Sequence, residues 1–255
     1  MIIDYVKFSG FRSGRFALTT IIGTEGRNKT VSKASSAPES KALIKTIADN
    51  CTKLKQQYKN IEVCPCTING DSTELIFAYI EGKPLSDIMV SLIQAGLKDE
   101  VFDMLLLYRS IIFDKDRLKP QLAHDVTPEF TEIFGEYKGV FPFEYIKRTN
   151  VDMLFSNLIY NNAGNYTIID YEWVIDFPIP VKFVYYRGIK YFFQDYKYKQ
   201  LHCLTLDESF ELFGISKDDI ATFDSMDYGF RDYVCGKNHL VYNRYRKQMQ
   251  SFLSL

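Results

Sequence analysis

The sequence predicts an α+β fold in which strands come first and helices follow. Residues 2–34 are rich in β-branched and aromatic residues and are broken by Gly-containing turns, which is typical of short antiparallel strands. From residue 86 onward, apolar residues recur mostly at helical spacing. The chain has 255 residues, which is enough to bury a hydrophobic core in one large domain or in two lobes.

The N-terminal stretch is expected to form three strands and then a helix. The strands are predicted over residues 2–8, 15–22 and 30–34. A helix over residues 36–54 follows, because Ser36 and Glu39 stand three apart as in a capping box and apolar residues then recur at helical spacing.

Two more strands are predicted on either side of Asn69-Gly70, which is a strong hairpin signal. Pro and Gly recur over residues 115–145, so that stretch is expected to be irregular. The two strands cover residues 63–68 and 74–80, and helices are predicted over 86–95, 100–114, 181–194, 208–213, 216–222 and 238–253.

Residues 150–173 are the most informative stretch of the chain. Asp152 and Asn157 stand five apart before a short apolar strand, an Asn- and Gly-rich turn follows, and a second strand ends at Asp170. All three polar side chains can therefore lie at one end of a hairpin. Phosphoryl transfer needs such a set, because one carboxylate orients the attacking hydroxyl while other oxygens hold Mg²⁺. The alternative is that all three are turn and cap residues.

This stretch resembles the kinase-like superfamily. The Asp-x-x-x-x-Asn spacing and the later strand-end Asp are similar to the kinase catalytic loop and metal-binding Asp. The run Ile169-Asp170-Tyr171-Glu172-Trp173 looks like the Ile-Asp-Trp-Glu of aminoglycoside and choline phosphotransferases. Residues 169–180 also resemble kinase-like domains of bacterial polysaccharide (O-antigen) kinase–methyltransferases and glycosyltransferases. Asn150-Val151 and Tyr171-Glu172 replace the His-Arg and Phe-Gly of protein kinases.

The resemblance implies a two-lobe protein-kinase-like fold. Residues 1–80 would form an antiparallel-sheet N-lobe, a β-meander plus a helix, and residues 81–255 a mainly helical C-lobe with the catalytic hairpin at 150–173. Asp152 would be the catalytic residue, and Asn157 and Asp170 would hold Mg²⁺. Glu172 would join the metal shell or make a structural ion pair.

The resemblance also implies a set of nucleotide-binding residues. A strand Lys would contact the α/β-phosphates and pair with an acid of the following helix, glycines would let the backbone approach the phosphates, and an interlobe segment would present its backbone to adenine. These residues are Lys33, with Glu39 or else Asp49 as its acid, Gly10 and Gly14, and Tyr79, Ile80 and Glu81. Each has a plainer interpretation: a solvent-facing Lys, a helix cap, a hairpin turn, and a strand that runs into a turn.

The predicted function is ATP- and Mg²⁺-dependent transfer of the γ-phosphoryl group to a hydroxyl of a sugar, glycan or other small molecule. The alternative is a catalytically weak kinase-like module that binds nucleotide or a partner within a larger glycan-synthesis protein. No long activation segment or Ala-Pro-Glu follows Asp170, which argues against a protein kinase regulated by loop phosphorylation.

Net charge, apolar runs and cysteine number indicate which classes of partner and which cellular compartment to expect. The formal net charge of −1 gives no argument for a nucleic-acid partner. We expect no transmembrane segment and no signal peptide, because no run of about 18 apolar residues exists and the apolar start is interrupted by charges. Five cysteines without metal-ligand spacing fit a reducing cytoplasm, where we expect the protein.

Overall fold

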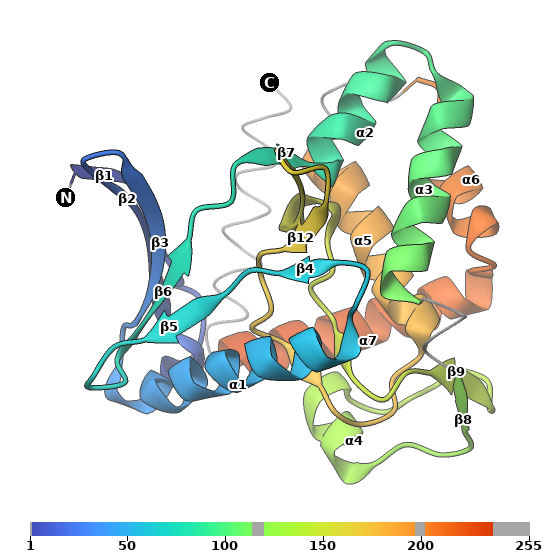
Figure 1. The fold of residues 1–255 in the computed structure, drawn as a ribbon. Helices are drawn as coiled ribbons and strands as arrows, with labels where there is room; N and C mark the ends of the chain where they lie inside the picture. Colours follow the sequence, from blue (N-terminus) through green and yellow to red (C-terminus); the bar gives the residue numbers. More distant parts are fainter. Residues whose placement is uncertain (1, 114–119, 197–201, 237–255) are drawn as a thin grey trace, which may run out of the picture. The chain divides into compact units, whose positions relative to one another are not determined.

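The computed structural model describes residues 2–113, 120–196 and 202–236. They form antiparallel strands and helices, which confirms the predicted α+β class (Figure 1). The described residues divide into two compact units. We call residues 2–49, 65–79 and 227–236 the sheet unit, and the other described residues the helical unit. The sequence predicts lobes of residues 1–80 and 81–255. In the structure, residues 227–236 belong to the sheet unit and residues 50–64 belong to the helical unit.

The sheet unit is built on one five-stranded antiparallel sheet. The β-branched and aromatic residues at the N-terminus correctly predict the first strand. The Asn69-Gly70 hairpin also forms, with Asn69 Oδ1 accepting from the Thr73 and Glu74 N–H groups at 2.9 and 3.1 Å. The strands in spatial order are β1 (Ile2–Phe8), β2 (Leu18–Glu25), β3 (Asn28–Ser35), β6 (Glu74–Ala78) and β5 (Cys66–Ile68).

The helix after β3 begins later than the sequence suggests. A 3-10 turn at Pro38–Ser40 precedes α1 (Lys41–Gln57). The predicted Ser36–Glu39 capping box is wrong, because Ser36 Oγ pairs with Thr19 Oγ1 at 2.7 Å. The Ala37 N–H instead donates to Ser40 Oγ at 3.3 Å.

A second, mixed sheet lies in the helical unit. Its strands in order are β4 (Glu62–Val63), β12 (Tyr166–Ile168), β11 (Leu158–Asn161) and β7 (Gly82–Pro84), with β4 parallel to β12. The single strand predicted over 63–68 is therefore two strands, and Pro65, which has no N–H to donate, stands between them. Two short ribbons pair β8 (Gln121–Ala123) with β9 (Phe143–Tyr145) and β10 (Thr149–Asn150) with β13 (Val174–Ile175).

Most of the remaining elements are helices. They are α2 (Leu85–Gln94), α3 (Lys98–Ile112), α4 (Pro128–Phe134), α5 (Val181–Tyr196), α6 (Leu206–Leu212) and α7 (Lys217–Cys235). Helix α4 lies in the stretch that was expected to be irregular. Its Pro128 occupies the first turn, and Thr127 Oγ1 caps it by accepting from the Phe130 N–H at 3.2 Å.

Two further predictions concern a membrane-spanning helix and a C-terminal helix. No helix in the described part of the chain combines the length and apolar character needed to cross a bilayer. The helix predicted over 238–253 lies outside the described residues.

Candidate functional site

The β11–β12 hairpin determines where the predicted metal ligands lie. Leu158 pairs with Ile168 at the base of the hairpin, directly after Asn157 and two residues before Asp170. The Ile169 N–H donates to the Asn157 carbonyl at 3.1 Å, which extends the pairing past the strands. The hairpin therefore brings Asn157 and Asp170 to the same end.

Asparagine side chains join the Asp152 loop to this end of the hairpin. Asn157 Nδ2 donates to the Asp152 carbonyl at 2.9 Å. The buried Asn150 accepts from the Asp152 N–H at 3.2 Å through Oδ1 and donates to the Asp170 carbonyl at 2.8 Å through Nδ2. One amide side chain thus connects the backbone of both acids, at the position where protein kinases have a His.

An arginine from α5 holds the Asp152 carboxylate. Arg187 Nη2 donates to Asp152 Oδ1 at 2.7 Å, and Arg187 Nε donates to the Val151 carbonyl at 3.0 Å. The two side chains are 5% and 18% exposed, so solvent screens this ion pair weakly. The second carboxylate oxygen accepts no hydrogen bond from the described residues. The clamp therefore fixes one oxygen of Asp152.

Sequence reasoning missed Arg187. It lies in a run that was interpreted only as an aromatic core helix, and it is buried there. A charged residue at a buried position of such a helix is itself a signal, because Arg is almost never fully buried without a partner.

Hydrogen bonds from uncharged side chains hold the segments that follow Asp152 and Asp170. Tyr108 on α3 donates its hydroxyl to the Met153 carbonyl at 2.6 Å, and burial raises the pKa of this phenol so that it remains a donor. Asn50 on α1, which is 1% exposed, donates through Nδ2 to the carbonyls of Tyr171 and Glu172 at 3.0 and 3.2 Å. The segments before and after the hairpin are thus held by side chains from different helices.

The predicted phosphate-binding residues lie in the sheet unit. Lys33 is 8% exposed on β3, between Thr20 of β2 and Leu75 of β6. Glu39 is exposed in the 3-10 turn and makes no ion pair with the described residues; a Cβ added at Gly14 would lie 3.5 Å from its Oε2.

The connection between β1 and β2 contains Gly10 and Gly14, and both are exposed. The N–H of Ser13 in this connection donates to the Val234 carbonyl of α7 at 2.9 Å. One of the backbone donors expected to face phosphate is therefore already bonded within the sheet unit.

Residues 79–81 connect β6 to β7 in the sequence. The β3–β6 ladder ends at Ala78 and the β7–β11 ladder begins at Gly82. Gly82 has a φ of 151°, and a Cβ there would lie 2.2 Å from the Tyr160 carbonyl oxygen, so only glycine fits. The Glu81 carboxylate accepts from Asn162 Nδ2 at 3.3 Å, and Lys29 Nζ lies 4.4 Å from the centroid of the Tyr79 ring.

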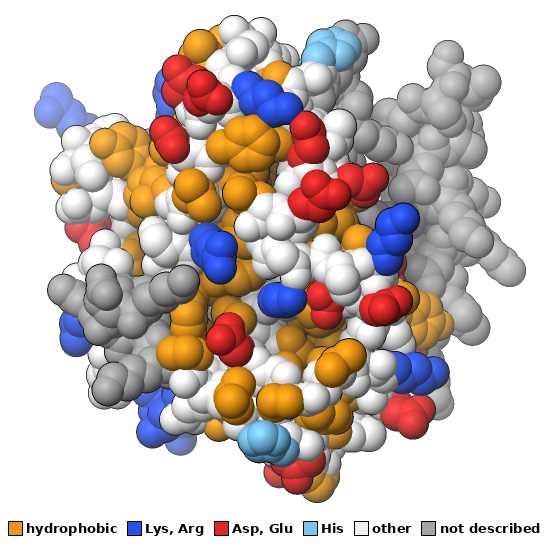
Figure 2. Space-filling view, turned by 90° about the vertical axis from the view of Figure 1, so that its right-hand side faces the viewer, with side chains coloured by type: hydrophobic (Ala, Val, Ile, Leu, Met, Phe, Trp, Pro, Cys, Tyr) orange, Lys and Arg blue, Asp and Glu red, His pale blue; other side chains and the backbone are white. Residues whose placement is uncertain are grey.

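The described residues contain no cluster of three or more His, Cys, Asp or Glu side chains that could hold a metal ion. Their charges are also dispersed: on the face shown in Figure 2, acidic and basic side chains are scattered singly among apolar ones. Asn157 and Asp170 would supply one amide oxygen and one carboxylate, a pair that fits a metal which completes its shell with phosphate oxygens and water.

No protein-family model matches the chain, and no curated protein matches it in sequence. The solved structures that are similar to it include three that we describe by name. Choline kinase LicA from Streptococcus pneumoniae is 12% identical, with 92% of this chain and 90% of that chain covered and a TM-score of 0.46. The gentamicin complex of APH(2″)-IIa is 12% identical, with coverages of 99% and 89% and a TM-score of 0.45. Macrolide 2′-phosphotransferase MphH from Brachybacterium faecium is 8% identical, with coverages of 89% and 86% and a TM-score of 0.41. The three are thus an aminoglycoside phosphotransferase, a macrolide phosphotransferase and a choline kinase.

Proposed function

We propose that this chain is a phosphotransferase that moves the γ-phosphoryl group of ATP to a hydroxyl of a small molecule, which includes sugars and glycans. The observation that carries the proposal is the hydrogen-bonded set in which Asn150 and Asn157 tie the Asp152 loop to Asp170. Catalysis of phosphoryl transfer consists mostly of positioning and charge stabilisation, and this set positions both acids.

Asp152 is the residue proposed to receive the acceptor hydroxyl. Because Arg187 occupies Oδ1, the acceptor hydroxyl would donate to Oδ2. The pair with Arg187 also fixes the orientation of the carboxylate. The backbone bonds from Asn150 and Asn157 keep the loop at a fixed distance from Asp170.

Asn157 and Asp170 are proposed to bind Mg²⁺. Asn157 Nδ2 is used by the Asp152 carbonyl, and Oδ1 accepts no hydrogen bond from the described residues, so the amide oxygen is the atom left for a metal. Mg²⁺ in such sites takes one or two protein oxygens and completes its octahedron with phosphate oxygens and water. Asn157 and Asp170 would thereby place a positive charge beside the phosphates of the nucleotide.

The nucleotide is proposed to be bound by residues that the kinase resemblance assigns. Lys33 would neutralise the α/β-phosphates and Glu39 would be the acid associated with it, while Gly10 and Gly14 would let the backbone approach the phosphates. Lys33 lies on β3, the third strand of the sheet unit, which is the position that the resemblance assigns to the phosphate-binding lysine. The backbone of residues 79–81 would meet adenine, which fits their position between two strand ladders.

A second candidate is a nucleotide-binding module with little catalytic activity. One observation favours it: the Ser13 N–H, in the connection proposed to cover the phosphates, is already bonded to Val234. In both cases the proposed setting is the cytoplasm, where the five free thiols of the structure would stay reduced, and the chain could be part of a larger glycan-synthesis protein.

The first experiment measures nucleotide binding by thermal shift with Mg-ATP and with ATP plus EDTA. The native chain and the Asp103→Asn variant, which removes an exposed acid of α3, should be stabilised by Mg-ATP, whereas Asp170→Asn should not. Absence of a shift in the native chain would refute both candidates. A full shift in Asp170→Asn would refute the metal assignment.

The second experiment measures transfer of labelled phosphate from ATP to a panel of aminoglycosides, choline and free sugars. Asp152→Asn should abolish transfer while leaving the Mg-ATP thermal shift in place. Stabilisation by Mg-ATP without transfer to any acceptor would favour the binding module.

A further inference from the structure

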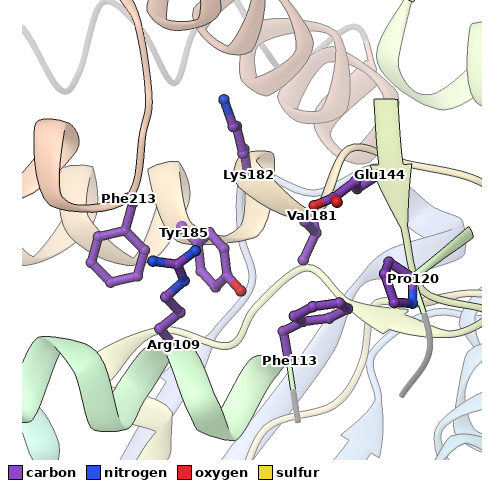
Figure 3. A pocket seen from close by; sticks show the side chains of 8 residues that line it. All are labelled: Arg109, Phe113, Pro120, Glu144, Val181, Lys182, Tyr185 and Phe213. Carbon is purple, nitrogen blue, oxygen red and sulfur yellow. The ribbon is translucent and has the colours of Figure 1, made fainter. Parts of the chain in front are cut away.

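A cavity of about 330 Å³ lies within the helical unit, between α3, α5 and the end of α6 (Figure 3). Its lining includes Arg109, Phe113, Glu144, Val181, Tyr185 and Phe213. None of the residues assigned to phosphotransfer lines it. Its volume is at the lower end of the range for small-molecule sites.

The cavity lies on the side of α5 away from the catalytic loop. Tyr185 lines the cavity, and Arg187, two residues later on the same helix, binds Asp152. Two residues correspond to a rotation of roughly 200° around an α-helix, so their side chains leave α5 on opposite faces. A ligand in the cavity would therefore not occupy the phosphotransfer site.

Arg109 and Tyr185 bring hydrogen-bond donors to this space. The Arg109 guanidinium lies beside the Tyr185 ring (Figure 3), and no carboxylate among the described residues pairs with it. Tyr185 is 3% exposed, and its hydroxyl points into the cavity (Figure 3). Burial raises the pKa of this phenol, so it remains protonated and its own proton still needs an acceptor.

The other charged residues of the lining define the rest of the site. The Lys182 ammonium points away from Arg109 and Tyr185 (Figure 3) and is bound by the Gly214 carbonyl and Asp219, so only its aliphatic stem contributes. Glu144 lies at the other end of the lining. Its carboxylate would repel a second acidic group on a ligand whose first acid is at Arg109.

The walls between these ends are apolar and flat. Phe113 and Phe213 are buried, and the Phe213 ring packs against Tyr185 with the ring centroids 4.8 Å apart. Such walls favour a planar apolar ring over a flexible or strongly polar body. A carboxylate is the planar acceptor that matches the fork of a guanidinium.

We propose that this cavity is a second binding site, separate from the phosphotransfer site, for a small monocarboxylate built on a single planar ring. The carboxylate accepts from Arg109 and from the Tyr185 hydroxyl, and the ring lies between the aromatic walls. The proposal does not depend on the phosphotransferase activity.

The test uses sodium benzoate as the probe and benzamide as its neutral counterpart, with binding to the full chain measured by ligand-observed NMR and calorimetry. Benzoate should bind saturably, and benzamide about tenfold or more weakly. Arg109→Met should weaken benzoate binding by about tenfold or more, and Tyr185→Phe should weaken it by a smaller factor. The Phe variant keeps the ring that packs on Phe213.

The control variant is Lys98→Met, which removes an exposed cation of the same helix and should leave the benzoate affinity unchanged. Asp152→Asn should also bind benzoate normally, which separates this site from the catalytic loop. If Arg109→Met does not fold, the comparison of benzoate with benzamide on the native chain and on Arg109→Lys decides. The proposal is overturned if benzoate does not bind up to about 10 mM, if benzamide binds equally well, or if Asp152→Asn abolishes binding.

Discussion

The Arg187 guanidinium donates to the Asp152 carboxylate at 2.7 Å, and 35 positions separate the two residues in the sequence. Its Nε also donates to the carbonyl of Val151, next to that acid. One side chain of α5 thus sets both the backbone and the carboxylate of the proposed catalytic residue.

Removal of this clamp should reduce phosphotransfer. In Arg187→Met we expect kcat to fall by about 10- to 100-fold with a smaller change in the acceptor KM, because the carboxylate loses its orientation. Stability should fall by about 3–5 kcal/mol, since the variant leaves a mostly buried carboxylate without its cation. Steady-state kinetics and urea unfolding measure the two effects.

Two other variants serve as controls for this prediction. Arg187→Lys keeps a positive charge but cannot reproduce both bonds, so its kcat should lie between the native and Met values. Lys190→Met removes a cation of the same helix that pairs with the exposed Asp224 and should leave kcat unchanged. Native activity in Arg187→Met would contradict the positioning role.

A methyl group at Gly188 should disturb the support of the catalytic loop. The added Cβ would lie 2.0 Å from the Tyr108 hydroxyl, which is the group that holds the Met153 carbonyl. We expect Gly188→Ala to cost about 1–3 kcal/mol in urea unfolding and to lower activity. Gly70→Ala, where no atom lies within 4 Å of the added Cβ, should stay within about 0.5 kcal/mol of the native chain.

The origin of this loss can be tested by a second substitution. Gly188→Ala combined with Tyr108→Phe removes the oxygen that the new methyl group meets first. Part of the stability should return, although the Met153 carbonyl then lacks its donor. A double variant no more stable than Gly188→Ala would locate the strain elsewhere.

Substitution of Asn50 should weaken the segment that follows Asp170. Asn50→Ala removes two hydrogen bonds to buried carbonyls, and we expect a loss of about 1–3 kcal/mol. The Mg²⁺ concentration needed for half-maximal stabilisation by ATP should also rise, because Asp170 immediately precedes these carbonyls. Thr46→Ala, at an exposed position of the same helix, should change neither measurement. An unchanged Mg²⁺ requirement in Asn50→Ala would refute the link.

Acid should destabilise the native chain partly through Glu208. Its pKa is lowered to about 2, first by the hydrogen bond from Lys98 and then by the N–H and hydroxyl of Thr205. Because the folded state favours the ionised form, this stabilisation is present above the usual pKa of 4.5 and is lost as the pH falls from there toward 2. Melting temperatures across this range should fall more steeply for the native chain than for Glu208→Gln, and parallel curves would contradict this prediction.

Local signals in the sequence predicted much of the fold. The β-branched and aromatic residues at 2–8 predicted the bounds of β1, and the Asn-rich turn at 161–165 indicated the β11–β12 hairpin. A hairpin depends on a few neighbouring residues, so Asn157 and Asp170 could be placed together without tertiary information. Pro128 misled the prediction, because the same residue that breaks a helix also begins one.

The supports of the site could not be predicted in this way. Arg187, Tyr108 and Asn50 contact the segments around Asp152 and Asp170 from 35 to 122 positions away. Periodicity within one element does not reveal a partner in another. The Ser36–Glu39 pair failed for a related reason: a neighbouring strand offered Thr19 as a competing partner for the serine.

The sheet unit is assembled from three separated segments, and its β1–β2 connection is bonded to Val234 near the end of α7. During synthesis, the ribosome must therefore produce every residue of the helical unit before this bond can form. Until then, the N-terminal strands of the nascent chain would lack the contacts that residues 227–236 provide. A fragment that stops near residue 80 would keep the five strands and lack the helical segment that completes their unit.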